Sequence, residues 1–207
     1  ISKNTRLGVI NMYTNEDSKN NIKANTNSVI ALQQKLFSRS NLSLLLINRQ
    51  NTAKNELDYN RVVGVDYNLL SKDGVWDGKF YFHNSFSTLN KTNPFSTGFT
   101  LSYNTRNNSI YSKVIRLGEG FVSDLGFIRR KGIFKNYFRY ERRFWLKNKK
   151  IRSINVISSL AYIDKPENES LITDRNYRLG LQFDFNSMAG IDISLRKDYT
   201  HLEDSFN

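Results

Sequence analysis

Apolar and polar residues alternate along most of the chain with a period of two. Within Val75–Ser87, the aromatic residues of one parity alternate with polar or charged residues of the other. The same alternation returns in Phe95–Asn104, Ile133–Leu146, Asn176–Phe185 and Ile191–Thr200. This period is typical of strands with one apolar and one polar face, whereas an amphipathic helix repeats about every 3.6 residues. The chain is therefore predicted to be all-β.

The alternation delimits about eleven strands, which are longer than those of most soluble sheets. We expect them at Thr5–Thr14, Ser28–Phe37, Asn41–Gln50, Tyr59–Leu70, Val75–Ser87, Phe95–Asn104, Ser109–Leu117, Ile133–Leu146, Arg152–Ile163, Asn176–Phe185 and Ile191–Thr200. Soluble strands usually have ~5–6 residues, and ~9–11 are needed to cross a bilayer. Aromatic residues lie toward many strand ends, as in the interfacial girdles of membrane barrels.

The predicted connections alternate between short turns and longer loops. Short turns are expected at 38–40, 71–74, 105–108, 147–150 and 186–190, and longer loops at 15–27, 51–58, 88–94, 118–132 and 164–175. Outer-membrane barrels keep short turns on the periplasmic side and long loops outside. We therefore predict an antiparallel up-and-down transmembrane β-barrel. Because the strand count is odd, residues 1–207 are expected to be one portion of a larger even-stranded barrel, with no internal boundary.

A soluble β-sandwich that binds carbohydrate is the alternative interpretation. Such a fold buries one face of each of two sheets, and its connections follow no strict rule of long and short. It predicts that exposed aromatic residues gather on one polar face. It also predicts that Trp76 and Trp145 lie away from the apolar faces.

The composition excludes several kinds of site. The 207 residues include no Cys and two His. Disulfides, thiolate metal ligands, a Cys nucleophile and a His-rich metal site are therefore ruled out. The mean hydropathy of −0.55 is typical of a soluble protein, but the alternating strands of a membrane barrel average to such a value as well. The longest aliphatic run, Leu44–Ile47, is too short for a membrane-spanning helix.

Lys and Arg outnumber Asp and Glu by 31 to 19, which gives a formal charge of +12. Aromatic and basic residues interleave in Phe134–Lys150, as they do in proteins that bind single-stranded nucleic acid. In a strand, however, these two kinds of residue point to opposite faces, and a stacking groove needs both on one face. We therefore predict no nucleic-acid partner. Outer-membrane lipid and lipopolysaccharide phosphates are better partners for loop cations such as Lys19, Lys23 and Arg130.

Charged residues of both signs share the polar parity of the later predicted strands. These candidate lumen or ligand residues are Arg139, Glu141, Arg143, Arg178, Asp184, Asp192 and Arg196. Oppositely charged side chains on neighbouring strands pair across a ladder, so a hydrated, salt-bridged wall and a charged ligand site are both open. A glycosidase-like pair of Asp184 and Asp192 is disfavoured, because nearby arginines favour ionised carboxylates and a general acid must be protonated. We predict no catalytic residue, no metal site and no cofactor.

The stretch Gly118–Gly132 is unusually apolar for a loop. Apolar residues in an external loop favour burial, so we predict an inward loop that enters the lumen or caps its mouth. Its marker residues are Phe121, Asp124, Phe127 and Arg129. The alternative is a strand pair over Phe121–Arg130 that turns at Lys131-Gly132.

Two patches of sequence resemble a known family. Arg49-Gln50 precedes Tyr59–Asp66, which reads YNRVVGVD, and Phe121–Arg129 reads FVSDLGFIR. This order resembles the C-terminal barrel region of the domain-of-unknown-function 5916 family of Bacteroidetes-like bacteria. The resemblance spans 49–129 and implies an outer-membrane barrel. Members of that family often carry an N-terminal domain similar to carbohydrate-binding family 9, for which this sequence has no counterpart.

The sequence therefore predicts a non-enzymatic protein of the bacterial outer membrane. We expect a β-barrel with a polar, loop-filled lumen that serves transport, surface binding or an envelope complex. Its predicted partners are outer-membrane lipid, lipopolysaccharide and other envelope proteins.

Overall fold

The computed structural model describes residues 2–20, 23–52, 58–88, 92–167 and 171–202. They contain eleven strands: β1 (Thr5–Thr14), β2 (Asn25–Leu36), β3 (Ser40–Asn51), β4 (Tyr59–Leu70), β5 (Trp76–Ser87), β6 (Phe95–Asn104), β7 (Asn108–Leu117), β8 (Ile133–Trp145), β9 (Ile151–Lys165), β10 (Leu171–Phe185) and β11 (Gly190–Thr200). The described residues contain no helix that could cross a bilayer.

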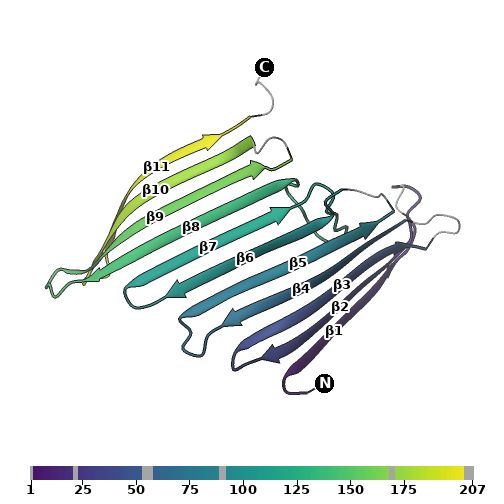
Figure 1. Ribbon diagram of the computed structural model, residues 1–207, viewed down its shortest axis with the longest axis horizontal. Helices are drawn as coiled ribbons and strands as arrows, with labels where there is room; N and C mark the ends of the chain where they lie inside the picture. Colours follow the sequence, from purple (N-terminus) through teal and green to yellow (C-terminus); the bar gives the residue numbers. More distant parts are fainter. Residues whose placement is uncertain (1, 21–22, 53–57, 89–91, 168–170, 203–207) are drawn as a thin grey trace. The chain divides into compact units, whose positions relative to one another are not determined.

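All eleven strands belong to one sheet, in which consecutive strands are neighbours (Figure 1). The prediction of an all-β, up-and-down antiparallel fold with about eleven strands is confirmed. The sheet is open, because among the described residues β1 is hydrogen-bonded only to β2 and β11 only to β10. Closure into a barrel stays a prediction.

Contacts divide the chain into two compact units, and each is described by itself. Unit 1 comprises Ile1–Leu69, Lys79–Gly98 and Arg116–Gly132, and unit 2 comprises Leu70–Gly78, Phe99–Ile115 and Ile133–Asn207.

In unit 1, large apolar side chains line one face of the sheet, called here its apolar face. The register places Leu44 opposite Val65 and Leu46 opposite Val63. These four side chains are 37–51% exposed. The other face, called here the polar face, carries Asn60, which is 2% exposed. This inverts the usual arrangement in water, where large apolar groups are buried and polar groups are exposed.

Unit 2 has the same two faces. On its apolar face, Leu181 of β10 lies opposite Val156 of β9 and opposite Ile193 of β11. The exposed fractions are 43% for Leu181, 41% for Val156 and 59% for Ile193. On the polar face, Ser153 and Asn155 are each only 1% exposed. The sequence periodicity therefore produces two chemically different faces in both units.

The start of β10 departs from the prediction. We expected a long loop over 164–175, but β9 continues to Lys165 and β10 begins at Leu171. The register shifts between Ile172 and Asp174, so Thr173 forms a bulge. The bulge reverses the parity of the strand, which hides its first residues from a two-residue pattern. The predicted loop was therefore wrong at both ends.

Candidate functional site

The polar face of unit 1 carries the segment 118–132, called here the inward loop. Asn60 is at the centre of this contact: its side-chain nitrogen donates to the Val122 carbonyl, and its side-chain oxygen accepts from the Asp124 amide, both at 3.0 Å. The Val122 amide donates to the Ser85 hydroxyl, also at 3.0 Å. Three hydrogen bonds therefore attach the loop backbone to β4 and β5.

Arg49 on β3 adds ion pairs to this attachment. Its Nε atom lies 2.7 Å from Oδ2 of Asp124, and Nη2 lies 3.0 Å from Oδ1 of Asp58. Nη1 also donates to the side-chain oxygen of Asn25 at 3.0 Å. The Arg49 side chain is only 19% exposed. A guanidinium satisfied on several sides in this way fixes both its position and that of the loop.

The four predicted marker residues of the loop have different environments. Phe121 is buried, with 6% exposed, and Asp124 bonds to Arg49 and to Asn60. Phe127 is 91% exposed, and Arg129 is exposed as well. All of 118–132 is described and none of it is strand, so the alternative of a strand pair is wrong.

Glycine at position 118 permits the loop to leave β7 close to the backbone at the start of β6. Its amide donates to the Phe95 carbonyl at 2.9 Å. A Cβ atom there would lie 1.9 Å from the Asn93 carbonyl oxygen, which no side chain can tolerate.

A second polar cluster lies on β4 and β5 of unit 1. Asp66 accepts from Nε2 of His83 at 3.0 Å and pairs with the Lys79 ammonium at 3.3 Å. His83 lies over Gly64, where a Cβ atom would be 2.3 Å from the imidazole ring. The absence of a side chain at Gly64 is therefore what allows this histidine to reach Asp66.

We predict that Gly64→Ala displaces the His83 ring and lowers the free energy of unfolding by about 1–3 kcal/mol, the usual cost of overpacking. Chemical denaturation measures the change. Gly8→Ala is the matched control, because the nearest atom to a Cβ atom there is 4.0 Å away. Equal stability of the two variants would contradict the assigned role of Gly64.

In unit 2, six of the seven predicted charged residues take part in bonds between charged or polar groups on the polar face. Glu141 pairs with Arg139 at 3.0 Å and with Arg143 at 3.1 Å. The Arg143 Nε atom donates to Asn155 at 3.0 Å, and Asn155 donates to Asp184 at 3.1 Å. Glu141 and Asp184 are thus linked through Arg143 and the neutral amide of Asn155.

Further donors reach the same Asp184 carboxylate. The Ser153 hydroxyl donates at 2.8 Å and the Gln182 amide at 2.9 Å. We call the set Arg139, Glu141, Arg143, Ser153, Asn155, Gln182 and Asp184 the β8–β10 network. Sequence reasoning did not select Ser153, Asn155 and Gln182; the signal that could have found them is that they are polar residues on the polar faces of β9 and β10.

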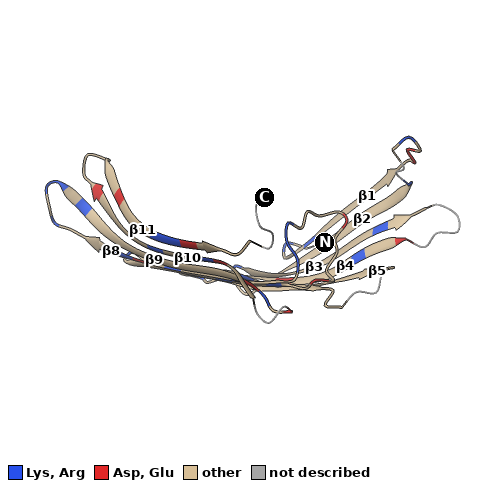
Figure 2. Cartoon of the chain, turned by 90° about the horizontal axis from the view of Figure 1, so that it is seen from above, with Lys and Arg blue, Asp and Glu red and all other residues tan. Residues whose placement is uncertain are grey.

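The remaining predicted residues lie on β10 and β11. Arg178 pairs with Asp192 at 3.0 Å. Asn176 donates to Asp198, and Arg196 lies on the same face. Figure 2 shows acidic and basic segments together on β11. This part of the face is more exposed than the β8–β10 network.

Asp184 and Asp192, the two carboxylates considered for glycosidase-like chemistry, each accept hydrogen bonds from neighbouring donors. The described residues also contain no cluster of three or more His, Cys, Asp or Glu side chains that could hold a metal ion.

The residues that carried the family resemblance meet in space. Arg49, Asn60 and Asp124 come from its separate motifs and contact one another directly. No protein-family model, curated protein or solved structure matches the chain. The resemblance to the domain-of-unknown-function 5916 family therefore stays a prediction.

Proposed function

We propose that the chain forms the wall of an outer-membrane β-barrel whose polar lumen binds or passes hydrophilic solutes. The apolar face of each unit then contacts lipid, and the polar face lines the lumen. The observation that carries the proposal is the exposed apolar face, on which Leu181, Ile193 and Phe82 are 43–59% exposed. Lipid solvates such a face, whereas water favours its burial.

The polar face supports the second half of the proposal. Paired charges such as Arg143 and Glu141 give the wall a polar surface that water can hydrate. The inward loop, attached through Arg49 and Asn60, occupies part of the lumen and restricts what enters. Size and charge of the solute are the properties that such a lumen selects.

Closure into a barrel would require a hydrogen-bonding partner for each of the two edge strands, β1 and β11. Unpaired backbone groups of β1 and β11 are costly in a bilayer, which requires a closed ladder. In an up-and-down sheet of eleven strands, the first and last run in the same direction. Antiparallel closure therefore requires further strands, supplied by the same protein or by a partner.

A soluble carbohydrate-binding sandwich is supported less well. That fold needs a second sheet packed on the apolar faces, and the described strands all belong to one sheet. Trp76 also lies beside Tyr103, with ring centroids 4.7 Å apart, on the apolar face rather than on a polar binding face.

Surface labelling of single cysteines tests the proposal, because the natural chain has none. We expect an impermeant maleimide to label an Arg178→Cys variant in native outer membranes and to leave Leu179→Cys unlabelled. These neighbours point to opposite faces, and Leu179 is 60% exposed in the structure. Detergent-dependent solubility and heat-modifiable gel migration are expected in parallel. Rapid labelling of Leu179→Cys in membranes would refute lipid contact.

A further inference from the structure

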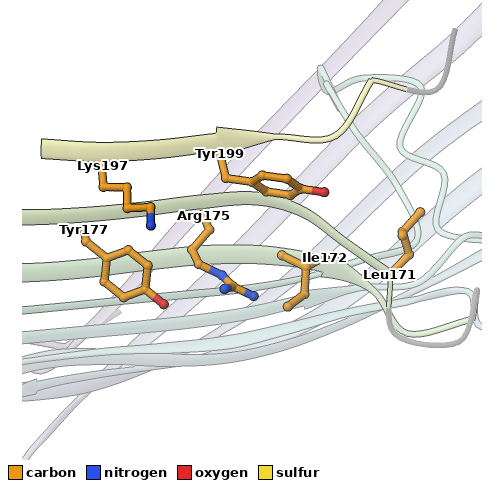
Figure 3. A pocket seen from close by; sticks show the side chains of 6 residues that line it. All are labelled: Leu171, Ile172, Arg175, Tyr177, Lys197 and Tyr199. Atoms are coloured by element: carbon orange, nitrogen blue, oxygen red, sulfur yellow. The ribbon is translucent and has the colours of Figure 1, made fainter.

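A cavity of about 800 Å³ opens on the apolar face of unit 2, at the end of β10 and β11. Figure 3 shows its lining side chains, which are Leu171, Ile172, Arg175, Tyr177, Lys197 and Tyr199. The two cations set this cavity apart from the centre of the face, where Leu181 and Ile193 lie opposite each other.

The register arranges the four polar-tipped residues as a square. Tyr177 lies directly opposite Lys197, and Arg175 lies directly opposite Tyr199. Each cation therefore has a tyrosine across the ladder and another along its own strand. In Figure 3 the Lys197 side chain extends toward the β10 residues of the cavity. Such a square offers two positive groups and two hydroxyl groups to one small anion.

The bulge at Thr173 contributes the apolar part of the lining. Ile172 pairs with Asp164 before the bulge and Asp174 pairs with Ile163 after it. This shift places Ile172 on the same face as Arg175, although their numbers differ by an odd interval. Bulges commonly re-aim side chains next to functional sites.

The charges in the cavity are available to a ligand. No hydrogen bond or ion pair joins the Arg175 or Lys197 side chain to another residue in the part of the chain that the structure describes. The nearest acidic residue by register, Asp164, is not among the described residues that line the cavity. The site therefore carries a positive charge that its described lining does not neutralise.

We propose that this cavity binds the phosphate headgroup of a membrane lipid, with Arg175 and Lys197 as the phosphate ligands. Tyr177 and Tyr199 donate hydrogen bonds to the same group, and Ile172 and Leu171 contact the start of the acyl chains. This inference rests on the proposed function, because a lipid reaches the site only if the apolar face lies in a bilayer. The site lies near the ends of β10 and β11, which in a membrane barrel is the level of the lipid headgroups.

Native mass spectrometry of the detergent-purified protein tests the site with phosphatidic acid, which has a phosphate monoester, and phosphatidylcholine as the neutral comparison. We expect phosphatidic acid to be retained preferentially. In the double variant Arg175→Gln/Lys197→Gln its retention should fall about tenfold or more, since each lost charged hydrogen bond typically weakens binding by about that factor. The control Lys147→Gln/Lys149→Gln removes the same charge from the turn after β8 and should retain the lipid.

Two outcomes would overturn the site. Equal retention of the lipid by both double variants would show that Arg175 and Lys197 reach the membrane interface without binding the lipid phosphate. Displacement of the lipid by millimolar glycerol phosphate would show that the site takes a free phosphate instead. Heat-modifiable migration of the same samples reports the proposed function separately, so its loss would identify a failure of the barrel rather than of the site.

Discussion

Leu181→Arg is expected to destabilise the folded protein in lipid by about 2–4 kcal/mol, the cost of a cation at the middle of the lipid-facing band of a barrel. Leu181 lies between Val156 and Ile193 in the register, so the new charge would have only apolar neighbours across both ladders. Urea unfolding in lipid vesicles, followed by the shift between the folded and unfolded gel bands, measures the change.

The neighbouring substitution Gln182→Arg is the matched control. Gln182 points to the polar face, where it bonds to Asp184 and lies opposite Asp192. An arginine there gains carboxylate partners and should leave stability within about 1 kcal/mol of the parent, as expected for a lumen position. A soluble sheet predicts a different result, because Leu181 is already 43% exposed and an arginine there would remain in water. Equal stability of the two variants would therefore exclude the lipid-facing assignment.

The two-residue period was sufficient to predict most strands, because the two faces differ so strongly in chemistry. Tyr59–Leu70 and Phe95–Asn104 were predicted with the bounds that the structure has. In β4, for example, Val63 and Val65 alternate with Asn60 and Asp66, and a shift by one residue would exchange the faces. The order of strands followed from the short connections.

The sequence did not reveal the beginning of β10 because a bulge interrupts the period. Leu171 and Ile172 precede Thr173, and beyond the bulge the apolar parity changes from even to odd numbers. When the two-residue alternation is followed along the sequence, this change of parity looks like the end of a strand. The cavity at Arg175 was missed for the same reason, since its lining comes from both sides of the bulge.

The docking of the inward loop was only partly predictable. Its apolar composition indicated burial, but Phe121 and Phe127 look equivalent in sequence and differ widely in exposure. What distinguishes them is the contact of the nearby backbone with Asn60 and Ser85, which are distant in the chain. Long-range partners of this kind are not encoded in local periodicity.

The charged face was predicted as a group of residues but not as a bonded network. Shared parity placed Glu141, Arg143 and Asp184 on one face. The link between them runs through Asn155, a neutral side chain whose two ends bond to Arg143 and to Asp184. A search for charged pairs cannot detect such an intermediate.

Arg49→Gln is expected to release the inward loop and to open the lumen. The substitution removes the guanidinium that joins Asp124 of the loop to Asp58. The Arg49 side chain is mostly buried and bonds to Asp124, Asp58 and Asn25. We therefore expect the free energy of unfolding to fall by about 2–3 kcal/mol, which is less than the cost of breaking a fully buried ion pair. The backbone contacts at Asn60 remain, so the sheet itself should still form.

Single-channel recording in planar bilayers measures the opening directly. We expect a higher conductance for Arg49→Gln than for the parent, and faster tryptic cleavage in the loop at Arg129–Lys131. Arg61→Gln is the matched control, since Arg61 lies on the apolar face of β4, where it bonds to the amide side chains of Asn48 and Gln50 and lies over the Tyr59 ring. If the conductance of Arg49→Gln equals that of Arg61→Gln, the loop does not restrict the lumen. We expect the rise in conductance in Arg49→Gln and not in Arg61→Gln, because Arg49 bonds to Asp124 of the loop.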